Sequence, residues 1–260
     1  MFAGPRIQLQ FSLRATLQAS LRLLQRGLHT MLPCSCALCG GTAPDTLCTA
    51  CRRQFFSQTV CRCQQCALPL PDLPLVDAPR CGNCLQQAPY FDASIAASDY
   101  IAPIDELVIG LKFGGQLALA PLMASLLRDA MLRQTECDLP DLLIPVPLAN
   151  DRLRTRGFNQ AIEIGRSLSA SLGVPLAINV VMRHRETAPQ SLLPLDARHA
   201  NLRAAFSLTD AARAAVQGRH IGVVDDVMTT GATLQAMAAI LKEAGAQRVT
   251  NLIFARTLPK

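Results

Sequence analysis

Residues 221–233 read Ile-Gly-Val-Val-Asp-Asp-Val-Met-Thr-Thr-Gly-Ala-Thr. The apolar, β-branched run from Arg219 to Val227 predicts a buried strand, and the segment from Thr233 to Ala244 predicts a helix. A strand that passes through a short loop into a helix is one unit of a parallel α/β sheet, and such sheets bind ligands at the carboxyl ends of their strands. Asp225 and Asp226 are therefore expected at a ligand-binding edge.

The loop after this acidic pair has the composition of an anion site. The first N–H groups of a helix have no intrahelical partner, and the helix dipole adds to their attraction for a phosphate. Threonines add hydroxyl donors, and a glycine lets the backbone approach the ligand closely. The segment is neither a Walker loop nor a dinucleotide-binding loop. The sequence predicts phosphate contacts from Thr229, Thr230, Gly231, Ala232 and Thr233, and a sugar diol on Asp225 and Asp226.

Strand and helix signals alternate from about residue 90 to the end of the chain. Further strands are expected at residues 93–100, 141–147, 176–182 and 248–255, and helices at 103–134, broken at Gly114-Gly115, and at 159–172. This order predicts an α/β fold, a parallel sheet with helices on both of its faces.

Basic residues near these elements are candidates for the rest of a charged ligand. A guanidinium-rich loop with Arg154 and Arg156 follows the strand that ends at Pro147, and arginine suits bidentate contacts with phosphate; a solvated basic loop is the alternative. Lys112 follows an apolar helix and either reaches the pocket or is an ordinary exposed lysine. Arg183 begins a long polar stretch that suits a lid over a charged substrate, or a plain surface excursion.

Ten of the eleven cysteines lie between Cys34 and Cys84. They include four Cys-x-x-Cys pairs: Cys36/Cys39, Cys48/Cys51, Cys63/Cys66 and Cys81/Cys84. Two such pairs make a tetrahedral Cys₄ site, so the region predicts one or two structural Zn²⁺ ions, with disulfides or an iron–sulfur cluster as alternatives. Sequential pairing is the simplest arrangement and cross-braced pairing stays open; Cys34 or Cys61 could replace a neighbouring ligand.

These motifs together resemble those of two groups of known proteins. Residues 223–233 look like the 5-phosphoribosyl-1-pyrophosphate (PRPP) motif of type I phosphoribosyltransferases. Residues 34–260 resemble the ComF family of competence-associated, phosphoribosyltransferase-like proteins, including its gluconate-linked bacterial branch. The resemblance rests on the cysteine pairs, Leu111-Lys112-Phe113, Pro145-Val146-Pro147, Arg156-Gly157-Phe158-Asn159-Gln160, the pattern Thr187/Gln190/Arg198/Asn201/Phe206, and Val224-Asp225-Asp226 through Thr233.

The resemblance implies a type I phosphoribosyltransferase-like sheet preceded by a small zinc-ribbon region, with PRPP and Mg²⁺ as ligands. It implies catalytic roles for Asp225, Asp226 and Arg156, and ligand contacts from the 229–233 loop, Pro147, Lys112 and Arg183. Two functions stay open. One is phosphoribosyl transfer to an unknown acceptor, and the other is non-catalytic handling of single-stranded DNA in DNA uptake, with a partner protein of the uptake machinery.

Three regions are expected: a basic amphipathic extension at 1–33, a double zinc ribbon at 34–88 and a phosphoribosyltransferase-like domain at 89–260. The formal net charge of +6 fits a phosphate-rich ligand or nucleic acid, whereas two Tyr and no Trp argue against extensive base stacking. No apolar run reaches the ~20 residues that cross a bilayer, so we expect a cytoplasmic protein without stable membrane insertion.

Overall fold

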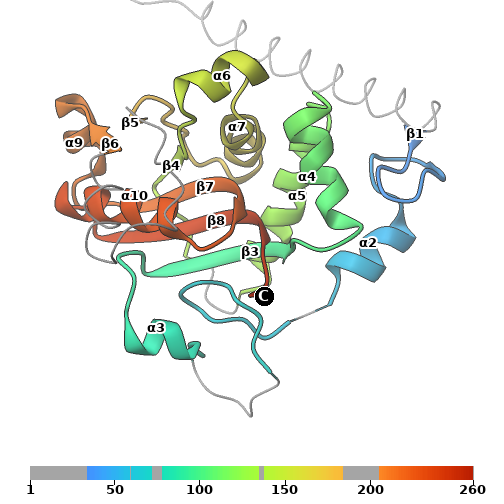
Figure 1. Cartoon of the computed structure of the whole chain (residues 1–260), viewed down its shortest axis with the longest axis horizontal. Coiled ribbons are helices and arrows are strands. Elements are labelled where there is room, and N and C mark those ends of the chain that lie inside the picture. Colours follow the sequence, from blue (N-terminus) through green and yellow to red (C-terminus); the bar gives the residue numbers. More distant parts are fainter. Residues whose placement is uncertain (1–33, 59, 72–77, 135–137, 184–204, 260) are drawn as a thin grey trace, which may run out of the picture. The chain divides into compact units, whose positions relative to one another are not determined.

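The computed structural model describes residues 34–58, 60–71, 78–134, 138–183 and 205–259 (Figure 1). The chain forms two compact units, one that ends at Arg53 and one that begins at Gln54. This division falls inside helix α2 (Thr49–Phe56). The boundaries expected from sequence at 33/34 and 88/89 stay predictions, and the extension at 1–33, Cys137 and the positions 187, 190, 198 and 201 of the family pattern lie outside the described residues.

The first unit contains little regular structure. Strands β1 (Cys34–Ser35) and β2 (Thr42–Ala43) form a short antiparallel pair before α2 begins. Among its described residues, Ala43 and Leu47 are buried in addition to Cys36 and Cys51. So few buried apolar side chains between residues 34 and 53 make the cysteines the main candidates for stabilising this segment.

A four-stranded parallel sheet organises the second unit. Its strands are β3 (Ala93–Asp99), β4 (Leu142–Pro145), β7 (His220–Met228) and β8 (Arg248–Arg256), in the order β3-β8-β7-β4 (Figure 1). The two central strands, β7 and β8, are buried along almost their whole length. Strands covered on both faces read as continuous apolar runs, as these do.

Four longer helices cover the sheet. They are α4 (Ile104–Phe113), α5 (Leu119–Leu132), α7 (Gln160–Leu172) and α10 (Ala232–Glu243). The connection from β3 through α5 to β4 and the connection from β7 through α10 to β8 run in opposite directions across the sheet. Because parallel crossovers are right-handed, α5 and α10 lie on opposite faces. The α/β fold with a parallel sheet covered by helices is thus confirmed, as is the break between α4 and α5 at Gly114-Gly115.

Shorter elements complete the unit. They are α3 (Gly82–Gln86), α6 (Asn150–Arg156), the antiparallel pair β5 (Val181–Arg183) and β6 (Phe206–Leu208), and α9 (Asp210–Val216). No helix in the described part of the chain is long and apolar enough to cross a membrane.

Two local expectations were wrong. The strand expected at 176–182 is reduced to a single bridge between Leu176 and Leu143, because the chain then leaves the sheet and β5 pairs with β6 instead. The arginine-rich loop after Pro147 is the helix α6. It ends at Gly157, whose φ of 80° is the left-handed conformation common after a helix.

Candidate functional site

The acidic pair lies at the carboxyl end of β7. Asp226 is 7% exposed, Asp225 is partly exposed, and the Asp226 N–H donates to Asp225 Oδ1 over 2.9 Å. Lys112 reaches this pair from the end of α4, with its Nζ 3.1 Å from Asp226 Oδ2. Lys112 is therefore not an ordinary exposed lysine, because its side chain contacts the acidic pair.

One of the two carboxyl groups, that of Asp225, does not titrate as an ordinary aspartate. Loss of hydration and then the neighbouring charge of Asp226 raise the pKa of Asp225 to about 8. The Asp226 N–H and the charges of Lys112 and Arg183 oppose this rise without cancelling it. At neutral pH the Asp225 side chain is thus mostly a neutral acid, next to the ion pair of Asp226 with Lys112.

A small pocket of about 50 Å³ opens beside the pair. Its lining consists of Asp225 and the loop into α10: Val227, Met228, Thr229, Thr230, Gly231, Ala232, Thr233 and Leu234. All five residues expected to contact a phosphate therefore line one cavity, together with one of the two acids. The N-terminal turn of α10 opens onto it, so N–H groups of this turn can face an anion, although that of Ala232 donates to Thr230 Oγ1 over 3.4 Å.

Gly231 has a structural reason to be a glycine. Its φ is +82°, and a Cβ at this position would lie 2.6 Å from the Cε atom of Met228. The positive φ of the turn therefore favours glycine, and a Cβ would also have to displace the end of the Met228 side chain.

The end of β4 forms the adjacent part of the site. Pro145 pairs with Val224, so the chain from Val146 to Pro147 continues beside the acidic pair. Asn159 holds this segment, because its Nδ2 donates to the Val146 carbonyl oxygen over 2.9 Å while its Oδ1 caps α7 by accepting from the Ala161 N–H. Sequence reasoning noted Asn159 only as part of a motif and missed this double role.

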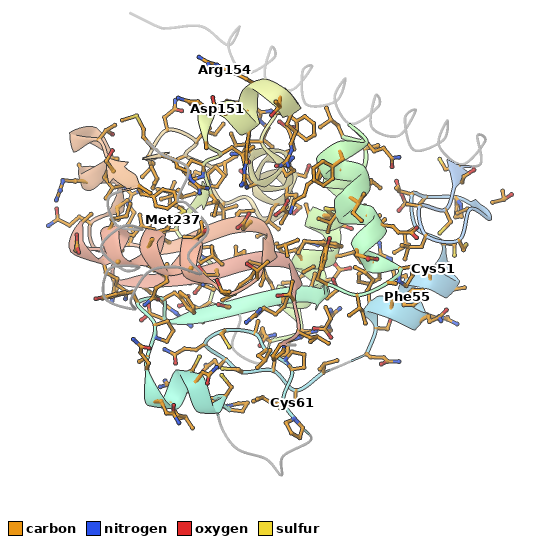
Figure 2. The ribbon with its side chains drawn as sticks, in the orientation of Figure 1. Cys51, Phe55, Cys61, Asp151, Arg154 and Met237 are labelled. Carbon is orange, nitrogen blue, oxygen red and sulfur yellow. The ribbon has the colours of Figure 1, made fainter. Side chains whose placement is uncertain are left out.

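The three candidate arginines differ in their surroundings. The Arg156 guanidinium lies over the ring of Phe113, 5.1 Å from the ring centroid. Phe113 directly follows Lys112 in the chain. Arg183 lies over the Phe206 ring at 5.4 Å, and its charge acts on Asp225. Arg154 is 82% exposed and 3.9 Å from the equally exposed Asp151 on the outer side of α6 (Figure 2). The lid expected after Arg183 lies outside the described residues.

Eight cysteines form two groups with the sequential pairing: Cys36, Cys39, Cys48 and Cys51 in the first unit, and Cys63, Cys66, Cys81 and Cys84 in the second. In each group all four sulfur atoms lie within 4.8 Å of one another. Cys34 and Cys61 belong to neither group among the described residues.

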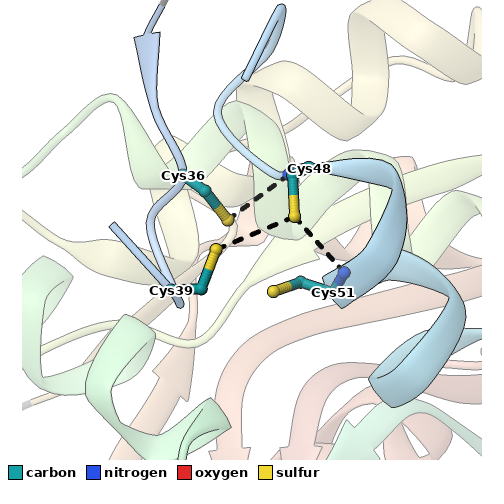
Figure 3. Close-up of side chains that lie close together, drawn as sticks. All are labelled: Cys36, Cys39, Cys48 and Cys51. Atoms are coloured by element: carbon teal, nitrogen blue, oxygen red, sulfur yellow. Dashed lines mark hydrogen bonds between the residues drawn. The ribbon is translucent and has the colours of Figure 1, made fainter. Parts of the chain in front are cut away.

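The sulfur geometry fits a Cys₄ metal site. Cys39 Sγ and Cys48 Sγ are 3.8 Å apart (Figure 3), and Cys66 Sγ and Cys81 Sγ are 3.6 Å apart. A tetrahedral zinc with bonds of about 2.3 Å places its sulfurs roughly 3.8 Å apart. A disulfide, in contrast, needs about 2.05 Å, and the cysteines of both groups are free.

Backbone N–H groups stabilise the thiolate form of one cysteine in each group. Burial raises the pKa of the Cys36 thiol. Hydrogen bonds that include those from the Cys39 and Cys48 N–H groups outweigh this effect and lower the pKa to about 6. In the second group burial raises the pKa of Cys63, yet hydrogen bonds from the backbone N–H groups of Cys66 and Cys81 lower it to about 7. Since zinc binds thiolates, these two groups could hold zinc ions.

One residue at the site was missed completely. Arg256, at the end of β8, is 9% exposed and donates to backbone carbonyl groups of the phosphate loop, including that of Met228 at 3.1 Å. An arginine that ends an otherwise buried strand was a usable signal, but its partners are distant in sequence.

Comparisons with known proteins agree with this arrangement. A family model described as the phosphoribosyl transferase domain matches residues 159–257. The DNA utilization protein YhgH of Salmonella typhimurium is 38% identical over 217 residues, which cover 82% of this chain and 91% of that protein. Competence protein F of Haemophilus influenzae is 35% identical over 221 residues, with 82% and 93% coverage.

Among solved structures, a glutamine PRPP amidotransferase from B. subtilis is 22% identical, with a TM-score of 0.36. The match covers 52% of this chain and 26% of that one. The identity and coverage of the two bacterial relatives establish the family. The chain belongs to the ComF family of competence-associated proteins with a phosphoribosyltransferase-like domain.

Proposed function

We propose that the chain binds PRPP at the carboxyl end of β7 and transfers its phosphoribosyl group. The observation that carries this proposal is the shared wall of the site: Asp225 belongs both to the acidic pair and to the small pocket at the start of α10. A ribose 5-phosphate has a diol and a phosphate at its two ends, so one molecule matches both halves.

The 5-phosphate occupies the pocket lined by residues 227–234. The first turn of α10 and the hydroxyl groups of Thr229, Thr230 and Thr233 supply donors, and the helix dipole favours the negative charge. The neutral form of Asp225 suits this neighbour, because an ionised carboxylate in the lining would repel a phosphate dianion.

The ribose diol donates to the acidic pair. Asp226 is held in position by its ion pair with Lys112, and the carbonyl oxygen of neutral Asp225 still accepts a hydrogen bond. The pyrophosphate then faces the segment after Pro147 and Arg156. Mg²⁺, bound together with the pyrophosphate, would neutralise charge on this leaving group.

Transfer follows from the same positions. A nucleophile attacks ribose C1, the bond from C1 to pyrophosphate breaks, and positive charge develops on the sugar. Asp226 lies on the diol side of the ring and stabilises this charge electrostatically, with Lys112 fixing its position. Arg156 lies on the Phe113 ring and holds the departing oxygens through charge-assisted hydrogen bonds.

A DNA-binding role is the second candidate. It is favoured by the printed names of the relatives, a DNA utilization protein and a competence protein. In the first unit, Arg52 and Arg53 follow the ligand Cys51 on α2, which places two positive charges beside a Cys₄ group. Single-stranded DNA bound there by its phosphates would lose affinity steeply as salt rises.

Pyrophosphate release separates these candidates. The zinc-loaded chain is incubated with PRPP and Mg²⁺ and a panel of bases and amines, and released pyrophosphate is measured. Release that depends on one acceptor, and that disappears in the Asp226→Asn variant, supports the transferase. PRPP binding with no release from any acceptor, combined with salt-sensitive DNA affinity that Arg52→Ala/Arg53→Ala removes, supports the second candidate instead.

A further inference from the structure

Arg256 joins the second cysteine group to the phosphate loop. Its Nε donates to the carbonyl oxygen of Cys66 over 2.9 Å. Its Nη1 donates to the carbonyl oxygens of Met228, Thr229 and Thr257 on the other side. The guanidinium is buried and planar, so its donors cannot shift independently of one another.

A second arginine fixes the same cysteine segment to the sheet. Arg62 Nη1 donates to Asp99 Oδ1 over 2.6 Å and to the Ala67 carbonyl oxygen over 3.1 Å. Asp99 is the register partner of Arg256 across β3 and β8. The turn from Cys63 to Ala67 therefore meets the sheet at the edge where the phosphate loop begins.

The contacts of Arg256 also orient the loop. In a trans peptide the C=O and the following N–H point in opposite directions. Because the carbonyl groups of Met228 and Thr229 turn toward Arg256, the N–H groups of Thr229 and Thr230 turn away from it. Both threonines line the pocket, so their N–H groups can add to the donors that the first turn of α10 offers a phosphate.

We propose that Arg256 is a positioning residue that couples metal binding at Cys63, Cys66, Cys81 and Cys84 to phosphate binding at residues 229–233. This inference rests on the proposed PRPP function. A metal on the four thiolates fixes the Cys66 carbonyl group, which holds the Arg256 side chain, which in turn presents the loop N–H groups. The coupling is reciprocal by thermodynamic linkage, so PRPP tightens the metal at this group by the same factor as the metal tightens PRPP.

The first cysteine group provides an internal control. The partners of Arg256 are Cys66, Met228, Thr229 and Thr257, which all belong to the unit that begins at Gln54. PRPP is therefore expected to protect one zinc per chain and leave the other unaffected.

Zinc retention tests the coupling without any activity measurement. The full zinc-loaded chain is titrated with a chelating dye, with and without saturating PRPP and Mg²⁺, and zinc retained per chain is measured. We expect PRPP to raise the chelator concentration needed to remove one of two zincs by roughly tenfold. In Arg256→Lys this protection disappears even at saturating PRPP, since lysine lacks the planar fork. Arg248→Lys, at the other end of β8, keeps it.

The outcomes are distinct. If calorimetry shows that the wild-type chain binds PRPP but PRPP leaves zinc retention unchanged, the coupling is wrong and the proposed function stands. Full protection of zinc by PRPP in Arg256→Lys has the same meaning. Absence of PRPP binding to the zinc-loaded wild type contradicts the proposed function and the coupling with it. The wild-type comparison needs no variant, so a folding defect in Arg256→Lys leaves the test intact.

Discussion

Lys112 Nζ lies 3.1 Å from Asp226 Oδ2, which ties the end of α4 to the carboxyl end of β7. The two residues are more than one hundred positions apart in the chain. The ion pair gives Asp226 a cationic partner at a site where the residue is only 7% exposed. The acidic pair thus has two different members, an Asp226 in contact with Lys112 and an Asp225 whose pKa of about 8 keeps it protonated at neutral pH.

Replacing Lys112 removes the counter-charge of a buried carboxylate. We expect Lys112→Ala to lower PRPP affinity about tenfold and to destabilise the fold by roughly 1–3 kcal/mol, because Asp226 is left without its partner. Calorimetry and denaturant unfolding measure the two effects. Lys242→Ala is the matched control, since it breaks an ion pair of 2.7 Å with Asp92 that is more exposed. Equal losses in both variants would refute a special role for Lys112.

The raised pKa of Asp225 predicts a pH dependence of phosphate binding. The group is neutral below about pH 8 and charged above it, and it lines the pocket. The affinity for ribose 5-phosphate should therefore fall as pH rises from 7 to 9. Asp225→Asn stays neutral throughout, so its affinity should not change over this range beyond the titration of the ligand. A wild-type affinity that increases across pH 8 would show that the charged carboxylate is the binding form.

Gly231 tests the shape of the phosphate loop. Gly231→Ala places a Cβ 2.6 Å from Met228 Cε, so the end of the Met228 side chain must shift, and it puts a non-glycine residue at a φ of +82°. We expect PRPP affinity to fall at least tenfold, together with a stability loss of about 1–2 kcal/mol from the left-handed conformation. Gly218→Ala is the control, because it has the same kind of backbone strain at φ +72° but no atom lies within 4 Å of its added Cβ. It should lose stability and keep its affinity for PRPP.

The cysteine groups predict the metal content. The purified chain should contain two zinc ions, measured by mass spectrometry of the elements, and Cys36→Ser/Cys39→Ser should reduce this to one. A Cys34→Ser/Cys61→Ser variant should keep both ions, since neither residue belongs to a group. A full zinc complement in the first variant, or a loss in the second, would contradict the ligand assignment.

The parts of the site that could be predicted from sequence are those built by neighbouring residues. The strand, acidic pair and threonine loop from 221 to 233 are continuous in the chain, so their local pattern was enough to place the pocket. The cysteine pairs likewise carry their spacing within a few residues, although only the folded chain selects sequential over cross-braced pairing.

What sequence reasoning missed depends on contacts between distant segments. Arg256 contacts Cys66, 190 positions away, and no local pattern reports such a contact. β5 and β6 have three residues each, too short for a clear alternating pattern, and their pairing took the place of the strand expected at 176–182. The helix α6 was mistaken for a loop because its sequence is polar and none of its residues is buried.

Calorimetric titration of the zinc-loaded chain with PRPP and Mg²⁺ tests the central claim most directly. We expect saturable binding at one site per chain, and a sharp loss of affinity in Asp225→Asn/Asp226→Asn with the fold and zinc content unchanged. Absence of binding to the folded wild type, or equal affinity in the double variant, would contradict a ribose 5-phosphate site at residues 225–233.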